Sequence, residues 1–183
     1  MSLKIISGEF KGRTIKGFDI DGTRPTMDRV KESLFGTIQN YVPDSVALDL
    51  FAGTGNLGFE ALSNRASFCY FNDINIKCVK YIESVINELN LKDKSKVTNL
   101  NYKKALKFYK ENNIQFDLIF LDPPYKMDVL NEVIEYIKNN NLIKENGLIV
   151  CEIDNLYLNV DYYKKIKEKK YGSKYIVIYK NNL

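Results

Sequence analysis

The sequence predicts an α/β fold in which helices cover both faces of a mostly parallel sheet. From residue 46 onward, short apolar runs alternate with segments in which apolar residues recur every three or four positions, the patterns of strands and helices. Several of these runs are apolar at nearly every position, as strands covered on both faces should be. We therefore expect a doubly wound sheet of seven mostly parallel strands, closed by an antiparallel C-terminal hairpin.

The elements follow in order along the chain. Residues 4–18 are strand-like and contain three glycines, which indicates a small β-hairpin, and a helix is expected over residues 27–41. Residues 162–180 contain two strand patterns joined at Gly172 and Ser173, which predicts the closing hairpin. Between these ends we expect strands at 46–51, 67–72, 96–100, 116–121 and 147–152, and helices at 57–62, 76–90, 103–112 and 127–140.

The length of 183 residues and the ordinary composition indicate one domain over residues 1–183. Residues 1–41 would form an N-terminal extension of hairpin and helix, and residues 42–183 the core. No apolar run approaches the length of a membrane span, and the start has no signal-peptide pattern, so a cytoplasmic protein is expected. A monomer is ordinary for a chain of this size and is expected here. The three cysteines lie in apolar contexts and are expected to be reduced and buried.

The chain contains no histidine. This excludes a serine–histidine triad, a histidine general base and a histidine-ligated metal. The cysteines have no metal-ligand spacing either, so we expect no metal site.

Basic side chains gather at the two ends. Residues 1–31 hold seven lysines and arginines against four acids, and residues 164–180 hold seven lysines against one acid. Basic ends around a mildly acidic middle favour a polyanionic partner held at the periphery. The alternative is that the lysines only solvate exposed strands.

A glycine-rich loop follows the first core strand in "LDLFAGTGNLGFEAL". Gly53, Gly55 and Gly58 have the spacing G-x-G-x-x-G, and Asp73 lies 20 residues after Gly53. Such loops bind nucleotide-like ligands through backbone amides, with an acid for the ribose hydroxyls. Asp49, four residues before Gly53, would repel a pyrophosphate and attract an ammonium group. These residues favour S-adenosylmethionine (AdoMet), which carries such an ammonium group.

The stretch "DLIFLDPPY" places Asp122, Pro123, Pro124 and Tyr125 after the fourth core strand, at the sheet edge that carries the glycine loop. An exocyclic amine of a nucleobase is a poor nucleophile until two acceptors hold its protons and turn its lone pair toward a methyl donor. Asp122 and the Pro123 carbonyl can be these acceptors, because consecutive prolines stiffen the backbone. Tyr125 offers a stacking face for a flipped-out base. The alternative is a simple turn.

The loop closely resembles the class I, Rossmann-like methyltransferase motif D-x-F-x-G-x-G. The resemblance implies that Asn101 and Tyr102 border the adenine of AdoMet. The expected cofactor residues in the core are Asp49, Phe51, Ala52, Gly53, Thr54, Gly55, Gly58, Asp73, Asn101 and Tyr102.

The chain also resembles the bacterial 16S rRNA (guanine-N2)-methyltransferase family, within the D/N-P-P-Y amino-methyltransferases. The motifs "ISGEFKGRTI", "TRPTMDRVKESLFGTI", "LDLFAGTGNLGFEALSNRA" and "FLDPPY" carry the resemblance, in that order. It implies methylation of one guanine in the 16S rRNA of the small subunit or its assembly intermediate. It also implies that Arg24, Pro25, Thr26 and Asp28 lie over the cofactor pocket. Lys11, Arg13 and Arg29 are candidates for RNA contacts.

Three other functions stay open at this point. An adenine-N6 methyltransferase acting on DNA or RNA would use the same motif. An NAD-dependent oxidoreductase would use the glycine loop and Asp73 but would leave Asp49 and "DPPY" unexplained. A non-catalytic rRNA-binding assembly factor is the third.

Overall fold

The computed structural model describes residues 2–17, 26–124, 128–154 and 158–182, apart from the side chains of Ser2, Thr26 and Met27. Within these ranges no helix is long and apolar enough to cross a membrane. Cys69, Cys78 and Cys151 are buried and free of disulfide bonds, as expected.

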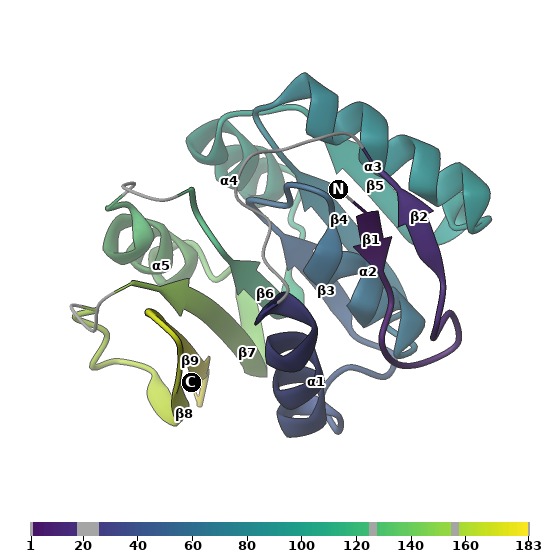
Figure 1. The fold of residues 1–183 in the computed structure, drawn as a ribbon. Coiled ribbons are helices and arrows are strands. Elements are labelled where there is room, and N and C mark those ends of the chain that lie inside the picture. Colours follow the sequence, from purple (N-terminus) through teal and green to yellow (C-terminus); the bar gives the residue numbers. More distant parts are fainter. Residues whose placement is uncertain (1, 18–25, 125–127, 155–157, 183) are drawn as a thin grey trace.

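A seven-stranded sheet forms the centre of the molecule, in the order β5-β4-β3-β6-β7-β9-β8 (Figure 1). The first five strands in this order pair in parallel, and β9 and β8 are antiparallel to their neighbours. The predicted sheet and its closing hairpin are confirmed. The strands are β3 (Val46–Asp49), β4 (Phe68–Asn72), β5 (Ser95–Thr98), β6 (Phe116–Leu121), β7 (Ile143–Ile153), β8 (Lys164–Tyr171) and β9 (Lys174–Lys180).

Helices cover both faces of the sheet (Figure 1). Buried side chains of the first three helices form one apolar cluster with one face, and those of the last two form a second cluster with the other face. These clusters explain why both faces of the central strands are apolar. The helices are α1 (Thr26–Ile38), α2 (Asn56–Ser63), α3 (Ile76–Glu88), α4 (Tyr102–Glu111) and α5 (Leu130–Asn139), with a short 3₁₀ helix η1 (Lys92–Lys94) before β5.

Two strands differ most in length from the prediction. The strand expected over 46–51 ends at Asp49, because the chain then turns and the Gly55 amide donates to the Ala52 carbonyl (2.7 Å). The strand expected at 147–152 begins earlier, at Ile143, which pairs with Phe116. Residues that pair across such an irregular register do not show the continuous apolar run from which strands are predicted.

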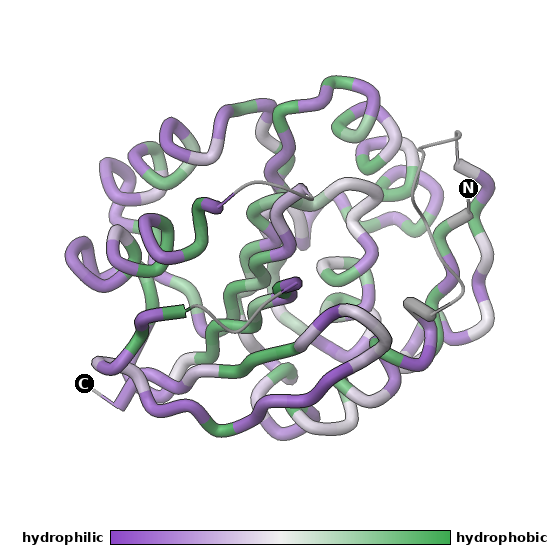
Figure 2. The backbone as a smooth tube through the Cα atoms, turned by 60° about the vertical axis from the view of Figure 1, so that its left-hand side comes forward, coloured by the Kyte–Doolittle hydropathy of each residue, from purple (hydrophilic) through white to green (hydrophobic). Residues whose placement is uncertain are grey.

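The C-terminal hairpin turns where the sequence predicts. Tyr171 pairs with Lys174, and Gly172 adopts the left-handed conformation at φ 60°. The outer strand β8 is lysine-rich and mostly exposed, whereas β9 is apolar and mostly buried; the hydropathy colours of Figure 2 follow this difference. A register shift lies between Lys165 and Lys167. The hydroxyl of Tyr171 hydrogen-bonds Ser33 of α1, which ties the hairpin to the helix.

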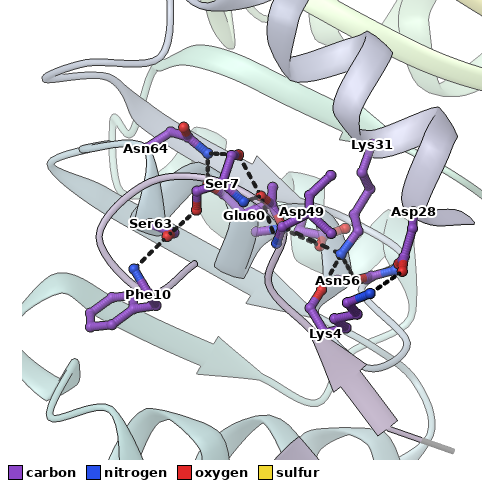
Figure 3. A network of polar contacts seen from close by, with 12 residues as sticks. Lys4, Ser7, Phe10, Asp28, Lys31, Asp49, Asn56, Glu60, Ser63 and Asn64 are labelled. Atoms are coloured by element: carbon purple, nitrogen blue, oxygen red, sulfur yellow. Dashed lines mark hydrogen bonds and ion pairs between the residues drawn. The ribbon is translucent and has the colours of Figure 1, made fainter. Parts of the chain in front are cut away.

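The N-terminal hairpin of β1 (Ser2–Lys4) and β2 (Thr14–Lys16) is also confirmed. It is held to the core by Glu60 of α2, which is fully buried (Figure 3). The Glu60 carboxylate accepts hydrogen bonds from the amides of Ile6 and Ser7 and from the Ser7 hydroxyl (2.6–3.3 Å). The amides of Ile6 and Ser7 thus find their hydrogen-bond acceptor in Glu60 rather than within the hairpin. This allows the hairpin to pack directly on α2 without leaving these amides unpaired.

Lys31 of α1 completes this network (Figure 3). Its side chain is 2% exposed, and its ammonium contacts Glu60 Oε2 (3.3 Å), Asn56 Oδ1 (2.7 Å) and the Lys4 carbonyl oxygen. Burial lowers the pKa of Lys31, although the Glu60 carboxylate opposes this shift. One ammonium therefore joins α1, α2 and β1 immediately beside the loop that follows β3.

We expect Lys31→Met to lower the free energy of unfolding by about 3–5 kcal/mol, because Glu60 would remain buried without its cation. Urea unfolding followed by circular dichroism measures the change. Lys4→Met is the matched control, since the Lys4–Asp28 ion pair is exposed and should be worth under about 1 kcal/mol. An effect of Lys31→Met no larger than that of the control would contradict the role of the buried pair.

Candidate functional site

Three predicted acids meet at one edge of the sheet. Asp49 is the last residue of β3, Asp73 follows β4 directly, and Asp122 follows β6 directly. These three strands are adjacent and parallel, so their carboxyl ends lie together. In doubly wound sheets this is the edge at which ligands bind.

The glycine loop between β3 and α2 forms a tight turn next to Asp73. The Gly53 amide donates to Asp73 Oδ2 (2.8 Å), and the Asn75 amide donates to Asp73 Oδ1 (2.8 Å), so the carboxylate is fixed in orientation. Gly53 has φ 56°, and a Cβ atom built on it would meet no atom within 4 Å. The backbone is thus open to a ligand at this point. Gly58 has a different use, because a Cβ there would lie 2.2 Å from the Phe71 ring, so α2 packs closely on β4.

Asp49 is almost completely buried beside the loop, at 2% exposure. Its Oδ2 accepts one hydrogen bond from the Gly58 amide (3.0 Å). Burial raises the pKa of Asp49 to about 7; the Gly58 hydrogen bond opposes the shift and the Asp73 charge adds to it. A cation bound at this edge would restore the ionised form. The expected acid is therefore present beside the turn, and a positively charged ligand would stabilise its buried carboxylate.

The other residues expected to bind the cofactor lie in the turn after β3 and at the start of α4. Thr54 and Ala52 are buried in the turn, and Phe51 packs against Tyr102 with ring centroids 5.7 Å apart. Asn101 caps α4 by accepting a hydrogen bond from the Lys103 amide (2.9 Å). The start of α4 thus contacts the segment that leads into the glycine loop.

Asp122 is accompanied by two charged residues that the sequence analysis did not single out. Lys174, the first residue of β9, places its Nζ 3.9 Å from Asp122 Oδ1 and forms an ion pair with Glu152 of β7. Burial raises the pKa of Asp122 to about 7; the charges of Glu152, Asp49 and Asp154 add to the shift and Lys174 opposes it. Pro123 is half-buried and Pro124 is exposed.

Glu152 and Lys174 were missed for different reasons. Glu152 is an acid at the end of an apolar strand, a signal that the sequence does carry and that matches the position of Asp122. Lys174 is one of seven lysines in its segment, and nothing in the pattern distinguishes it from the others. Ile74 was also missed: it follows Asp73 directly and is 69% exposed.

The described side chains among the N-terminal candidates are partly or fully exposed. Asp28, expected over the cofactor pocket, forms an exposed ion pair with Lys4 (3.2 Å). Lys11, Arg13 and Arg29 are exposed, the first two on or beside the N-terminal hairpin and the third on α1. The predicted roles of Arg24, Pro25, Tyr125 and the Thr26 side chain fall outside the described residues.

The sheet order, the glycine loop with Asp49 and Asp73, and the D-P-P segment after β6 define the class: the fold is that of a class I methyltransferase. Residues 3–180 match the model of the family described as conserved hypothetical protein 95. The chain belongs to this family. The resemblance to bacterial small-subunit rRNA methyltransferases, inferred from the motifs, is thereby confirmed at the level of the family.

Individual proteins agree with this assignment. The chain is 34% identical over 183 residues to ribosomal RNA small subunit methyltransferase D of Haemophilus influenzae, covering 98% of this chain and 94% of that protein. The solved structure of Escherichia coli protein yhhF superposes with a TM-score of 0.87 at 25% identity, over 100% of both chains. A Thermus thermophilus 16S rRNA N2-guanine methyltransferase, solved with AdoMet and guanosine, shares the fold (TM-score 0.70, 16% identity, 99% of this chain and 50% of that one).

Asp49 generates a prediction about stability. Because its pKa is higher in the folded than in the unfolded state, the folded state binds more protons between about pH 4 and 7, and the free energy of unfolding falls as pH rises through that range. The side chain at position 49 of Asp49→Asn cannot ionise, so its contribution to the free energy of unfolding does not fall with pH. The difference in free energy of unfolding between variant and wild type should therefore shift in favour of the variant by roughly 2–3 kcal/mol from pH 5 to pH 8.

Urea unfolding at the two pH values gives this difference directly. Asp93→Asn, which replaces an exposed acid in η1, is the control and should follow the wild type at both. An Asp49→Asn variant whose stability runs parallel to that of the wild type would show that Asp49 is ionised throughout.

Proposed function

We propose that this protein transfers a methyl group from AdoMet to the exocyclic N2 amine of one guanine in the 16S rRNA of the small ribosomal subunit or its assembly intermediate. The observation that carries the proposal is the position of Asp122, directly after a strand adjacent to β3, at the sheet edge where Asp49 and the glycine loop would form a cofactor cradle. The family relationship to small-subunit rRNA methyltransferases supports the substrate.

The cradle fits AdoMet group by group. Asp49 would attract the ammonium of the methionine part, and the open backbone at Gly53 would admit its carboxylate. Asp73, held by two amides, would accept the ribose hydroxyl protons. The exposed Ile74 side chain would cover one face of the adenine, with Asn101 and Tyr102 at its border. When bound, AdoMet supplies a methyl group attached to a positively charged sulfur.

The chain's own residues would prepare the amine for transfer. The carboxylate of Asp122 would accept a hydrogen bond from one N2–H group and the Pro123 carbonyl a hydrogen bond from the other, which turns the lone pair of N2 toward the methyl group. As the new N–C bond forms and the C–S bond breaks, the nitrogen becomes acidic, and Asp122 or water takes its proton. The rate enhancement then comes from alignment and from preorganised acceptors rather than from a strong base.

The RNA would be held by the basic ends of the chain. Lys11, Arg13 and Arg29 are exposed and free to reach phosphates, which would add a salt-dependent term to the affinity. We assign these RNA contacts to the N-terminal extension of residues 1–41, which would also cover the cofactor, and we assign the AdoMet-binding catalytic core to residues 42–183, within one domain of residues 1–183. Arg24, Pro25, Thr26 and Asp28 would close over the cofactor, and Tyr125 would stack on the target base.

The proposal is tested by incubating methyl-labelled AdoMet with small subunits that lack their native methylations, followed by nuclease digestion and mass spectrometry. We expect N2-methylguanosine at a single site. N6-methyladenosine would keep the mechanism and overturn the choice of base. Binding of AdoMet with no label on subunits, naked rRNA or DNA would favour an assembly factor, and binding of NAD in its place an oxidoreductase.

Replacing Asp122 separates chemistry from cofactor binding. We expect Asp122→Ala to reduce kcat by at least about 100-fold, because an acceptor of the amine proton is lost, with the AdoMet affinity changed less than about twofold. In the wild type, kcat should fall as pH decreases below about 7, where Asp122 becomes protonated. Equilibrium dialysis and single-turnover kinetics with saturating AdoMet measure the two quantities.

The matched variant is Asp122→Asn, which keeps an acceptor oxygen but cannot titrate. Its residual kcat should be nearly independent of pH between 6 and 8. A similar fall of kcat at low pH in this variant would assign the titration to another group, and loss of AdoMet affinity in Asp122→Ala would assign Asp122 a role in the cofactor site.

A further inference from the structure

We propose that Glu152 and Lys174 select guanine at the target position: Glu152 accepts a hydrogen bond from N1–H of the base and Lys174 donates one to O6, while Asp122 accepts one from the N2 amine. This inference rests on the proposed function and names the residues that would set its specificity for the base. Both lie on the C-terminal half of the sheet, outside the motifs that predict the methyltransferase site.

Strand register brings the three residues together. Leu121 of β6 pairs with Cys151 of β7, so the next residues of these parallel strands, Asp122 and Glu152, stand side by side. Side chains at the same register of neighbouring strands point to the same face of a sheet. Glu152 pairs in turn with Ile176 of β9, and Lys174 lies two residues before Ile176 and therefore on that same face.

The ion contacts confirm this placement. One Lys174 ammonium contacts Glu152 and lies 3.9 Å from Asp122 Oδ1. The Glu152 hydrogen bond and the charges of both acids raise the pKa of Lys174 even though burial lowers it, so the ammonium stays charged. Two carboxylates and one ammonium thus lie together where β6 and β7 end and β9 begins, with Asp49 and Asp154 as the other acids whose charges reach Asp122.

This group of charges is complementary to the Watson–Crick edge of guanine. That edge presents two donors, the N2 amine and N1–H, followed by one acceptor, O6. Two carboxylates and one ammonium supply the two acceptors and the one donor that this edge needs, and a flipped-out base is read by hydrogen bonds to this edge. Adenine offers an acceptor at N1 next to its N6 amine, which would face a carboxylate and leave buried polar groups unpaired.

A purely structural role is the competing explanation. Lys174 and Glu152 join β9 to β7, so the pair could serve only to hold the hairpin. The two roles differ in one property, because a hairpin contact cannot distinguish between bases. The test therefore changes single atoms of the base as well as the protein.

The substrate for the test is the small subunit reconstituted with 2-aminopurine in place of the target guanine. This base keeps the methyl-accepting amine but lacks N1–H and O6. We expect the replacement to reduce kcat/KM of the wild-type protein by on the order of 100-fold or more. For the double variant Glu152→Gln/Lys174→Met, which is slow on guanine, the further loss on 2-aminopurine should be less than about fivefold.

Matched controls come from the opposite end of β7 and from the part of β8 that pairs with the opposite end of β9. Glu145→Gln on β7 and Lys164→Met on β8 replace exposed residues and should keep the full discrimination. If the double variant is slower than the wild type by the same factor on guanine and on 2-aminopurine, the discrimination between the bases is unchanged. This result would overturn the proposal in favour of the structural role. If the double variant does not fold, the wild type alone decides, since equal rates on guanine and 2-aminopurine would also overturn it. Absence of wild-type activity on guanine would instead refute the proposed function.

Discussion

The parallel register of β3, β6 and β7 is the constraint on which the site depends. It places Asp49, Asp122 and Glu152 at the ends of neighbouring strands, and Asp73 follows at the end of β4. Burial raises the pKa of Asp49 and of Asp122 to about 7, and the neighbouring carboxyl groups at this edge add to both shifts. The ammonium of Lys174 relieves part of the repulsion near Asp122, and a cationic cofactor would relieve more at Asp49.

The periodic parts of the fold could be predicted from the sequence. The apolar runs gave the parallel strands, and the two glycine-containing ends gave both hairpins, because these features depend on residues close together in the chain. The boundaries of β3 and β7 were less accurate, since a turn hydrogen bond ends the first and an irregular register with β6 lengthens the second. Neither cause is visible in a local pattern.

The site, like the fold, was predictable where it depends on short motifs and not where it depends on pairing between distant segments. Asp49, Asp73 and Asp122 belong to short motifs whose spacing indicates their chemistry, and the structure places them together. Lys174 reaches Asp122 only because β9 returns along β7, a pairing across more than twenty residues of sequence. Lys31 belongs to the conspicuous segment after residue 24, yet its burial against Glu60 and the hairpin could not be predicted, because lysine is rarely buried. Asp28, in that segment too, pairs with Lys4.

The outer strand β8 has a consequence for how copies of this protein meet one another. An unprotected sheet edge exposes backbone amides and carbonyls that a second molecule can pair with, which is a route to aggregation. Here five lysines line the strand, and the register shift at Ile166 interrupts the straight row of amides. Two such edges brought together would place lysine against lysine, so each molecule repels its own copy through the edge that would otherwise extend the sheet.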